Sequence, residues 1–264
     1  MQTLERHSRI AAGQLILVLL FALPAAAGTR PCFPQSPDTI ESEVAHWAAR
    51  LKSSDEEERR EAVIMLSSFE GNAALPALES ALTDNSPRVR AAAVNSLASH
   101  RESLLVPLLA TRLKEDKVQF VRKAAAYALG AFQGAERTRV LIGALTQKDL
   151  EVRGAAAVSL GDHPDADAIV ALTSALSDKS AFVRAQAARG LGVNGRASQP
   201  AVPTLIRLLS SDGDSEVKRQ AATALGLIGD RSAIPALERA RQNQDPYLVG
   251  LATDALEQIK RNDE

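Results

Sequence analysis

The sequence predicts an all-α protein, a solenoid in which about seven helix-turn-helix units are stacked in a row. A segment of about 31 residues recurs along the chain, and a period of that length is typical of a repeat array. Within each copy, Leu and other apolar residues recur at three- and four-residue spacing, as in a helix with one buried stripe. Aromatic residues make up only 3% of the chain, which suits helices packed closely through Ala and Leu.

Residues 1–27 have the pattern of a secretory signal peptide. A basic start with Arg6 and Arg9 precedes an apolar run over residues 10–23, and small residues follow that run. We expect cleavage near Ala27 and export from a bacterial cytoplasm, to the periplasm or beyond it. The alternative is an uncleaved leader that tethers a structural protein to the membrane, because the apolar run, counted on to Ala27, approaches the length of a bilayer span.

Residues 28–38 are predicted to form a Pro-rich, extended linker. Cys32, in this linker, is the only cysteine, so no disulfide forms within the chain, and its role stays open. The repeat array is predicted over residues 39–261, and residues 262–264 form a polar tail.

The second helix of each unit follows one template: an apolar residue, a basic residue, two variable residues, two small residues, a variable residue, a small residue and Leu. The basic residue of the template falls at Arg90, Arg122, Arg153, Arg184 and Lys218. Looser copies place Arg59 before these five residues and Val249 after them. Because one unit alone cannot bury its apolar stripe, the units are expected to stack.

The first helix and the turns have their own recurring residues. Prolines are predicted in the first turn of the first helix, where a missing N–H costs little: Pro76, Pro107, Pro203 and Pro235. Aspartates ahead of the second helix are predicted as its N-caps: Asp84, Asp116, Asp178, Asp212 and Asp245. Glycines after the template Leu are predicted to end the second helix: Gly130, Gly161, Gly192 and Gly226.

The motif VRxxAAxALG resembles that of the HEAT-like repeats, in the short-repeat class first noted in phycobilin lyases. It lies at residues 89–98, 121–130, 152–161, 183–192 and 217–226. The resemblance implies a right-handed superhelix whose second helices line the concave side. It also implies that the basic residues bond to the neighbouring units as a structural ladder, which we prefer to a basic stripe for nucleic acid. We assign this ladder to Arg90, Arg122, Arg153, Arg184 and Lys218.

The residues indicate no catalytic or metal site. Three aspartates and His163 lie within residues 162–167, but turn and capping roles account for the aspartates, and we expect Asp165 to be a cap. The deoxyhypusine hydroxylases, which this repeat resembles in fold, use adjacent His-Glu pairs for iron, and the chain has none. We expect no enzyme activity and no cofactor. The alternative is an enzyme or enzyme subunit resembling the phycobilin lyases, whose expected place inside the cell conflicts with a signal peptide.

A partner is expected on the concave face of the second helices. The first and fifth positions after the basic residue share one face of the helix and do not repeat, so they offer specificity. With 31 basic and 32 acidic residues, the chain favours neither nucleic acid nor a membrane surface as partner. We expect a monomeric scaffold or adaptor that binds a protein or peptide of unknown identity. The expected contact residues are Asn95, Lys123, Tyr127, Arg189, Arg219 and Thr223; the alternative is that they are ordinary solvated positions.

Overall fold

The structure, a computed structural model, describes residues 37–163 and 165–261. The predicted signal peptide, residues 28–36 of the predicted linker and the predicted tail lie outside the described residues. The first helix begins at Pro37, so it includes the last two residues of the predicted linker.

The described residues form fourteen α-helices and no strand. The first helices of the seven units are α1 (Pro37–Arg50), α3 (Leu75–Ala81), α5 (Val106–Glu115), α7 (Ala135–Ala144), α9 (Ala166–Ala175), α11 (Val202–Ser211) and α13 (Ile234–Ala240). The second helices are α2 (Glu56–Leu66), α4 (Pro87–His100), α6 (Gln119–Leu129), α8 (Leu150–Asp162), α10 (Ala181–Val193), α12 (Ser215–Ile228) and α14 (Pro246–Arg261). Short 3₁₀ turns precede three of the first helices: η1 (Ser103–Leu105), η2 (Gly195–Ala201) and η3 (Arg231–Ala233).

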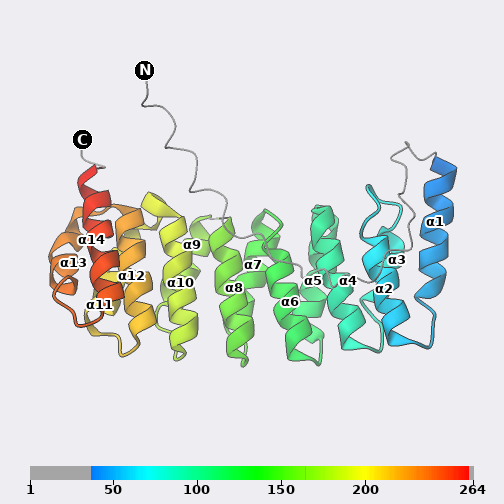
Figure 1. Cartoon of the computed structure of the whole chain (residues 1–264), viewed down its shortest axis with the longest axis horizontal. Coiled ribbons are helices and arrows are strands. Elements are labelled where there is room, and N and C mark those ends of the chain that lie inside the picture. The colour runs from blue at the N-terminus through cyan, green and yellow to red at the C-terminus, as the bar shows by residue number, and fades with distance from the viewer. Residues whose placement is uncertain (1–36, 164, 262–264) are drawn as a thin grey trace, which may run out of the picture. The chain divides into compact units, whose positions relative to one another are not determined.

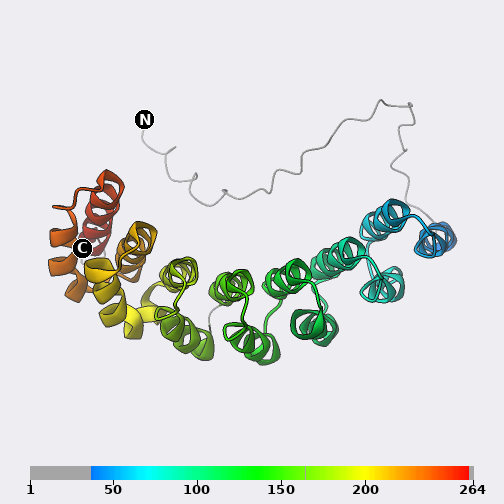
Figure 2. The ribbon, with the colours of Figure 1, turned by 90° about the horizontal axis from the view of Figure 1, so that it is seen from below.

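The helices form two layers along a curved row. Figure 1 shows the second helices α2 to α14 side by side in chain order. Seen from below, the row bends so that these second helices lie on its concave side and the first helices on its convex side (Figure 2). The all-α solenoid predicted from the repeat is therefore confirmed.

Apolar side chains from both layers meet in one continuous core. One leucine column of the first helices is fully buried: Leu78, Leu109, Leu141, Leu172, Leu205 and Leu237. The template leucines of the second helices are buried to the same degree: Leu97, Leu129, Leu160, Leu191 and Leu225. Each unit buries these residues partly against its neighbours, so the core depends on stacking.

The four prolines predicted in the first turn of the first helices are found there, in α3, α5, α11 and α13. Their missing N–H groups belong to the donors that a helix leaves unpaired at its start, so they cost no hydrogen bond. Proline thus marks the beginning of these helices in the sequence.

The glycines that follow the template Leu do not end the second helices as predicted, except for Gly130 after α6. Inside α8, α10 and α12 lie Gly161, Gly192 and Gly226. A Cβ on Gly161 would lie 2.7 Å from the Cα of Gly190 on the next second helix, and one on Gly226 would lie 2.7 Å from the Cα of Ala255. Glycine is needed here because the backbones of neighbouring second helices approach closely. Each of these helices ends one or two residues after its glycine, so the glycine lies in the last turn.

Candidate partner-binding surface

Each template arginine bridges two neighbouring units. The Arg90 guanidinium donates two hydrogen bonds to the carboxylate of Asp116 in the next unit, at 2.7 and 2.9 Å. Equivalent forks join Arg59 to Asp84, Arg153 to Asp178 and Arg184 to Asp212, and a single bond joins Arg122 to Asp149. Two parallel charge-assisted hydrogen bonds fix direction as well as distance, so each pair sets how one unit sits on the next.

The same arginines also hold the turn ahead of their own helix. Nη1 of Arg90 donates to the backbone carbonyl of Asp84 at 2.8 Å, and Nη1 of Arg184 donates to that of Asp178 at 2.9 Å. One guanidinium therefore contacts the turn of its own unit and the turn of the next unit. We call the row of contacts between these arginines, the aspartates of the next unit and the carbonyls of their own turn the arginine ladder.

Four of the five aspartates predicted as N-caps are turn residues instead. These four, Asp84, Asp116, Asp178 and Asp212, lie two residues before the N-cap and accept its N–H. Their carboxylates also bind the arginine of the preceding unit, and side chains such as Ser86 and Asp214 cap the helices. The hydrogen bond from Arg184 holds the pKa of the Asp212 carboxyl below its usual range. Only Asp245 directly precedes its helix, where it accepts the N–H of Tyr247.

The last contact of the ladder comes from Arg219 and not from Lys218, the residue at the template position. Nε of Arg219 donates to the Asp245 carboxylate at 2.9 Å, and the guanidinium lies 5.1 Å from the centre of the Tyr247 ring. A planar guanidinium bonds a carboxylate and stacks on a ring at once, which an ammonium group does less well. Arg219, expected to contact a partner, is therefore engaged within the chain.

The other expected contact residues fall into two groups. Exposed side chains are Asn95 on α4, Tyr127 on α6 and Arg189 on α10. Half-buried ones are Lys123, which pairs with Glu151 of the next unit, and Thr223, whose hydroxyl donates to the Arg219 carbonyl. The six residues lie on four second helices of the concave layer and form no single cluster.

Contacts made by the first turn of the second helices were not predicted from the sequence. The residue two positions before the template basic residue contacts the preceding second helix: Glu151 reaches Lys123, and Tyr247 reaches Arg219. Phe182 lies so close over Gly154 that a side chain at that glycine would collide with the ring. The sequence carries the signal, because Phe120 and Phe182 both precede Val-Arg of the template.

Four aromatic side chains on the concave helices are exposed, and we call them the aromatic set. They are Phe120 (46% exposed), Tyr127 (42%), Phe182 (42%) and Tyr247 (71%). Among the described residues, Phe132 is the only aromatic residue that is fully buried. Four of the seven Phe, Tyr and Trp residues in the described part of the chain are therefore exposed on the concave layer.

The comparisons with known proteins identify the repeat. A family model of HEAT repeats matches residues 44–130, 121–192 and 171–257, which together cover most of the chain. The chain belongs to the HEAT-repeat family. The search of curated proteins gave no match.

Solved structures agree on the fold of this HEAT-repeat array. Escherichia coli YibA is similar at 22% sequence identity and a TM-score of 0.60, over 84% of this chain and 82% of that chain. The complex of CpcE and CpcF of phycocyanin lyase from Nostoc sp. PCC7120 is similar at 21% identity and a TM-score of 0.50, over 91% of this chain and 97% of that chain. At such identities the likeness shows the fold alone.

Among the aspartates of residues 162–167, Asp165 makes the hydrogen bonds expected of a structural residue. Asp165 caps α9, as expected, by accepting the N–H of Ala168 at 2.7 Å, and it also accepts the Thr138 hydroxyl. Beside it, buried Arg137 donates to the backbone carbonyls of Leu129, Ser159 and His163. Within residues 37–163 and 165–261, no group of three or more His, Cys, Asp or Glu residues is arranged to hold a metal ion.

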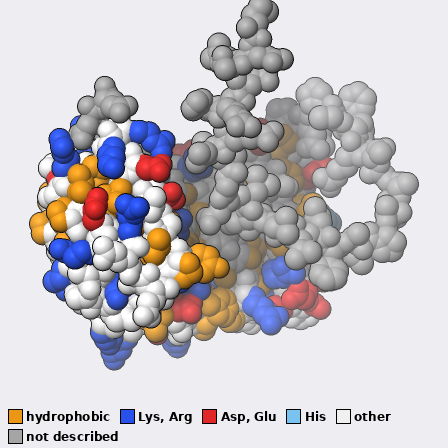
Figure 3. Space-filling view, turned by 60° about the vertical axis from the view of Figure 1, so that its left-hand side comes forward, with side chains coloured by type: hydrophobic (Ala, Val, Ile, Leu, Met, Phe, Trp, Pro, Cys, Tyr) orange, Lys and Arg blue, Asp and Glu red, His pale blue; other side chains and the backbone are white. Residues whose placement is uncertain are grey.

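Figure 3, with the C-terminal helices forward, shows basic, acidic and hydrophobic side chains intermixed over this end of the array. None of the helices described between residues 37 and 261 has the length and apolar character needed to cross a membrane.

Proposed function

We propose that this HEAT-repeat protein is an exported, non-catalytic scaffold that binds a protein or peptide on the concave layer, from α6 to α14. The observation that carries the proposal is the exposure of the aromatic set: Phe120, Tyr127, Phe182 and Tyr247. Large exposed rings cost a protein solubility unless a partner covers them, and Tyr is among the residues that contribute most to binding energy.

The contacts around these rings support a preformed surface. Phe182 packs over Gly154 and Tyr247 lies against Arg219, so both rings are oriented before any partner arrives. Rings that are already held lose little side-chain entropy on binding. The ladder beneath them keeps successive second helices in register, so a partner that spans several units meets a surface of constant spacing.

Export is the second part of the proposal, and it rests on residues 1–27. The basic start, the apolar run and the small residues near Ala27 support a cleaved leader. N-terminal sequencing of the protein purified from its native host tests this part. A mature chain beginning close to Gly28 is the expected result, and a chain that keeps its apolar run in the membrane fraction would favour the tethered alternative.

Photocrosslinking from the concave layer tests the binding role. A photoreactive residue replaces Tyr127 on α6, and a matched probe replaces Lys114, an exposed residue on α5 of the same unit. We expect one discrete crosslinked product from position 127 and none from position 114. Equal and diffuse labelling from both positions would contradict a concave binding surface.

A further inference from the structure

Helix α9, on the convex layer, is apolar but poorly covered by its neighbours. Within α9 only Ala168 and Leu172 are fully buried, and Val170 is 66% exposed. Val170 stands at the position that proline occupies in α3, α5, α11 and α13. A large apolar side chain that is exposed on a first helix can mark a binding site.

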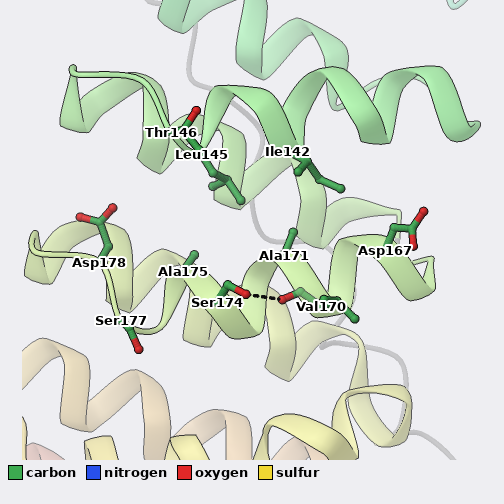
Figure 4. A pocket seen from close by; sticks show the side chains of 10 residues that line it. All are labelled: Ile142, Leu145, Thr146, Asp167, Val170, Ala171, Ser174, Ala175, Ser177 and Asp178. Atoms are coloured by element: carbon green, nitrogen blue, oxygen red, sulfur yellow. Dashed lines mark hydrogen bonds between the residues drawn. The ribbon is translucent and has the colours of Figure 1, made fainter.

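An open cavity of about 480 Å³ lies between α7 and α9. Figure 4 shows Ile142 and Leu145 pointing from the α7 segment toward Ala171 and Ala175 of α9 across the gap. The volume lies within the range of roughly 300–1,000 Å³ that is typical of small-molecule sites.

On the α9 side the gap is lined by small residues, a feature that α3 and α13 share at the same two positions and that α5 does not share. The positions of Ala171 and Ala175 are held in α5 by Leu108 and Arg112. Arg112 reaches back to the preceding unit and donates to the Leu82 carbonyl at 3.1 Å. Alanine leaves the corresponding space between α7 and α9 empty of side chains.

Two hydroxyl groups that line the cavity are placed to accept hydrogen bonds from a ligand. The Thr146 hydroxyl donates to the Gly143 carbonyl of α7 at 2.9 Å, and the Ser174 hydroxyl donates to the Val170 carbonyl of α9 at 3.1 Å, so both offer lone pairs to the cavity. Asp167 and Asp178 stand at its two ends, and none of the lining residues is basic (Figure 4). Asp178 already binds Arg153, so Asp167 is the carboxylate left to receive a cation.

We propose that this cavity binds a small organic cation, an ammonium group on an apolar chain or ring. The apolar part lies between Ile142 and Leu145 on one side and Ala171 and Ala175 on the other, and the ammonium group lies beside Asp167. An apolar anion meets two carboxylates and no basic side chain at the same place and is disfavoured. The site lies on the convex layer, so it does not depend on the proposed concave binding surface.

Calorimetric titration of the whole protein with hexylammonium, octylammonium and octanoate tests the ligand class. We expect octylammonium to bind about tenfold or more tightly than hexylammonium, since each buried methylene contributes about fourfold in affinity. Octanoate is expected to bind at least tenfold more weakly than octylammonium. Absence of octylammonium binding, or equal binding of octanoate, would overturn the proposal.

Substitutions then place the site. Ala171→Leu and, separately, Ala175→Leu fill the cavity and are expected to abolish octylammonium binding. Ala77→Leu, at the position of α3 that matches Ala171, serves as the control and is expected to leave binding unchanged. Asp167→Asn is expected to weaken octylammonium binding by about two- to fivefold, the range of an exposed ion pair. Unchanged binding in a folded Ala171→Leu or Ala175→Leu variant, checked by circular dichroism, would overturn the assignment to this cavity.

Discussion

At the scale of single residues, the arginine ladder makes the strongest contacts between units. Arg153 shows why: it is buried, it binds Asp178 through two hydrogen bonds, and it donates to two carbonyls of its own turn. Removing one member of such a pair leaves the other without its counter-charge in a poorly solvated place. A few buried Arg–Asp pairs therefore give most of the stabilisation that the ladder contributes.

Arg153→Ala is expected to lower the free energy of unfolding by about 3 kcal/mol, because Asp178 and two carbonyls lose their donor together. Urea denaturation followed by circular dichroism measures the change. Arg88→Ala is the control, since Arg88 is exposed and its contacts with Glu56 and Glu57 are long, 3.9 and 4.0 Å. A change of about 0.5 kcal/mol or less is expected there. Similar losses for both variants would contradict the structural weight given to Arg153.

The end of the ladder gives a second comparison at this scale. Arg219→Ala is expected to lower the thermal midpoint more than Lys218→Ala, because Arg219 makes the contacts with Asp245 and Tyr247. Thermal unfolding of the two variants, followed by circular dichroism, measures the two midpoints. A larger decrease in the midpoint for Lys218→Ala would show that the residue at the template position makes the more stabilising contact.

The resemblance to HEAT-like repeats predicted the ladder at the recurring basic residue, and four of its positions make the expected kind of contact. It did not reveal the displacement from Lys218 to Arg219. A template aligns positions, whereas reach and planarity decide which of two adjacent cations binds the carboxylate. The predicted caps failed at Asp84, Asp116, Asp178 and Asp212 for a related reason, because their carboxylates are already used by the neighbouring unit.

At the scale of helices, the small residues of the template set how closely the second helices pack. Gly161 and Gly190 face one another across α8 and α10, with no room for a Cβ on Gly161. The sequence showed where these glycines recur, but a glycine at the end of a helix and a glycine at a helix crossing look alike in one dimension. Only the next helix distinguishes them.

Two glycine substitutions separate these roles. Gly161→Ala is expected to destabilise the protein by about 1 kcal/mol or more, because the new methyl meets the backbone of Gly190. Gly143→Ala, inside α7 with no atom within 4 Å of the added Cβ, is expected to stabilise it by about 0.5–1 kcal/mol through helix propensity. Urea denaturation of both variants measures the difference. Equal stabilisation by the two alanines would show that α8 and α10 are further apart than described.

At the scale of the whole molecule, repetition makes the fold predictable and leaves the sites unpredictable. Seven units of two helices follow from one template that repeats along the chain, and the resemblance to HEAT-like repeats adds the concave position of the second helices. The cavity between α7 and α9 does not follow, because alanine stands at the positions of Ala171 and Ala175 in α3 and α13 as well, so the sequence does not mark α9 as different. The aromatic set was only partly predicted, through Tyr127.

The ladder also predicts how the array responds to acid. Hydrogen bonds from the arginines, against the opposite effect of burial, hold the pKa values of Asp116, Asp178 and Asp212 below the usual range. Their contribution to stability is fully present above the unfolded pKa of about 3.9 and is lost as the pH falls through the lower folded values. Burial raises the pKa of Asp162, which acts in the opposite direction.

We therefore expect urea midpoints that stay nearly constant between about pH 5 and 7 and fall below about pH 4. The triple variant with Asp116, Asp178 and Asp212 changed to Asn is expected to be less stable at neutral pH and to lose less on acidification. A variant that keeps the full acid response of the parent protein would show that other carboxyl groups cause it.

The central claim is that the aromatic set on the concave layer binds a partner. The most direct test is the yield of the crosslinked product from a photoreactive residue at position 127 when other rings of the set are removed. We predict that the double variant Phe120→Ser and Phe182→Ser loses this product, while Val170→Ser, which removes an exposed apolar side chain from the convex layer, keeps it. An equal yield from both variants, each folded by circular dichroism, would contradict the claim.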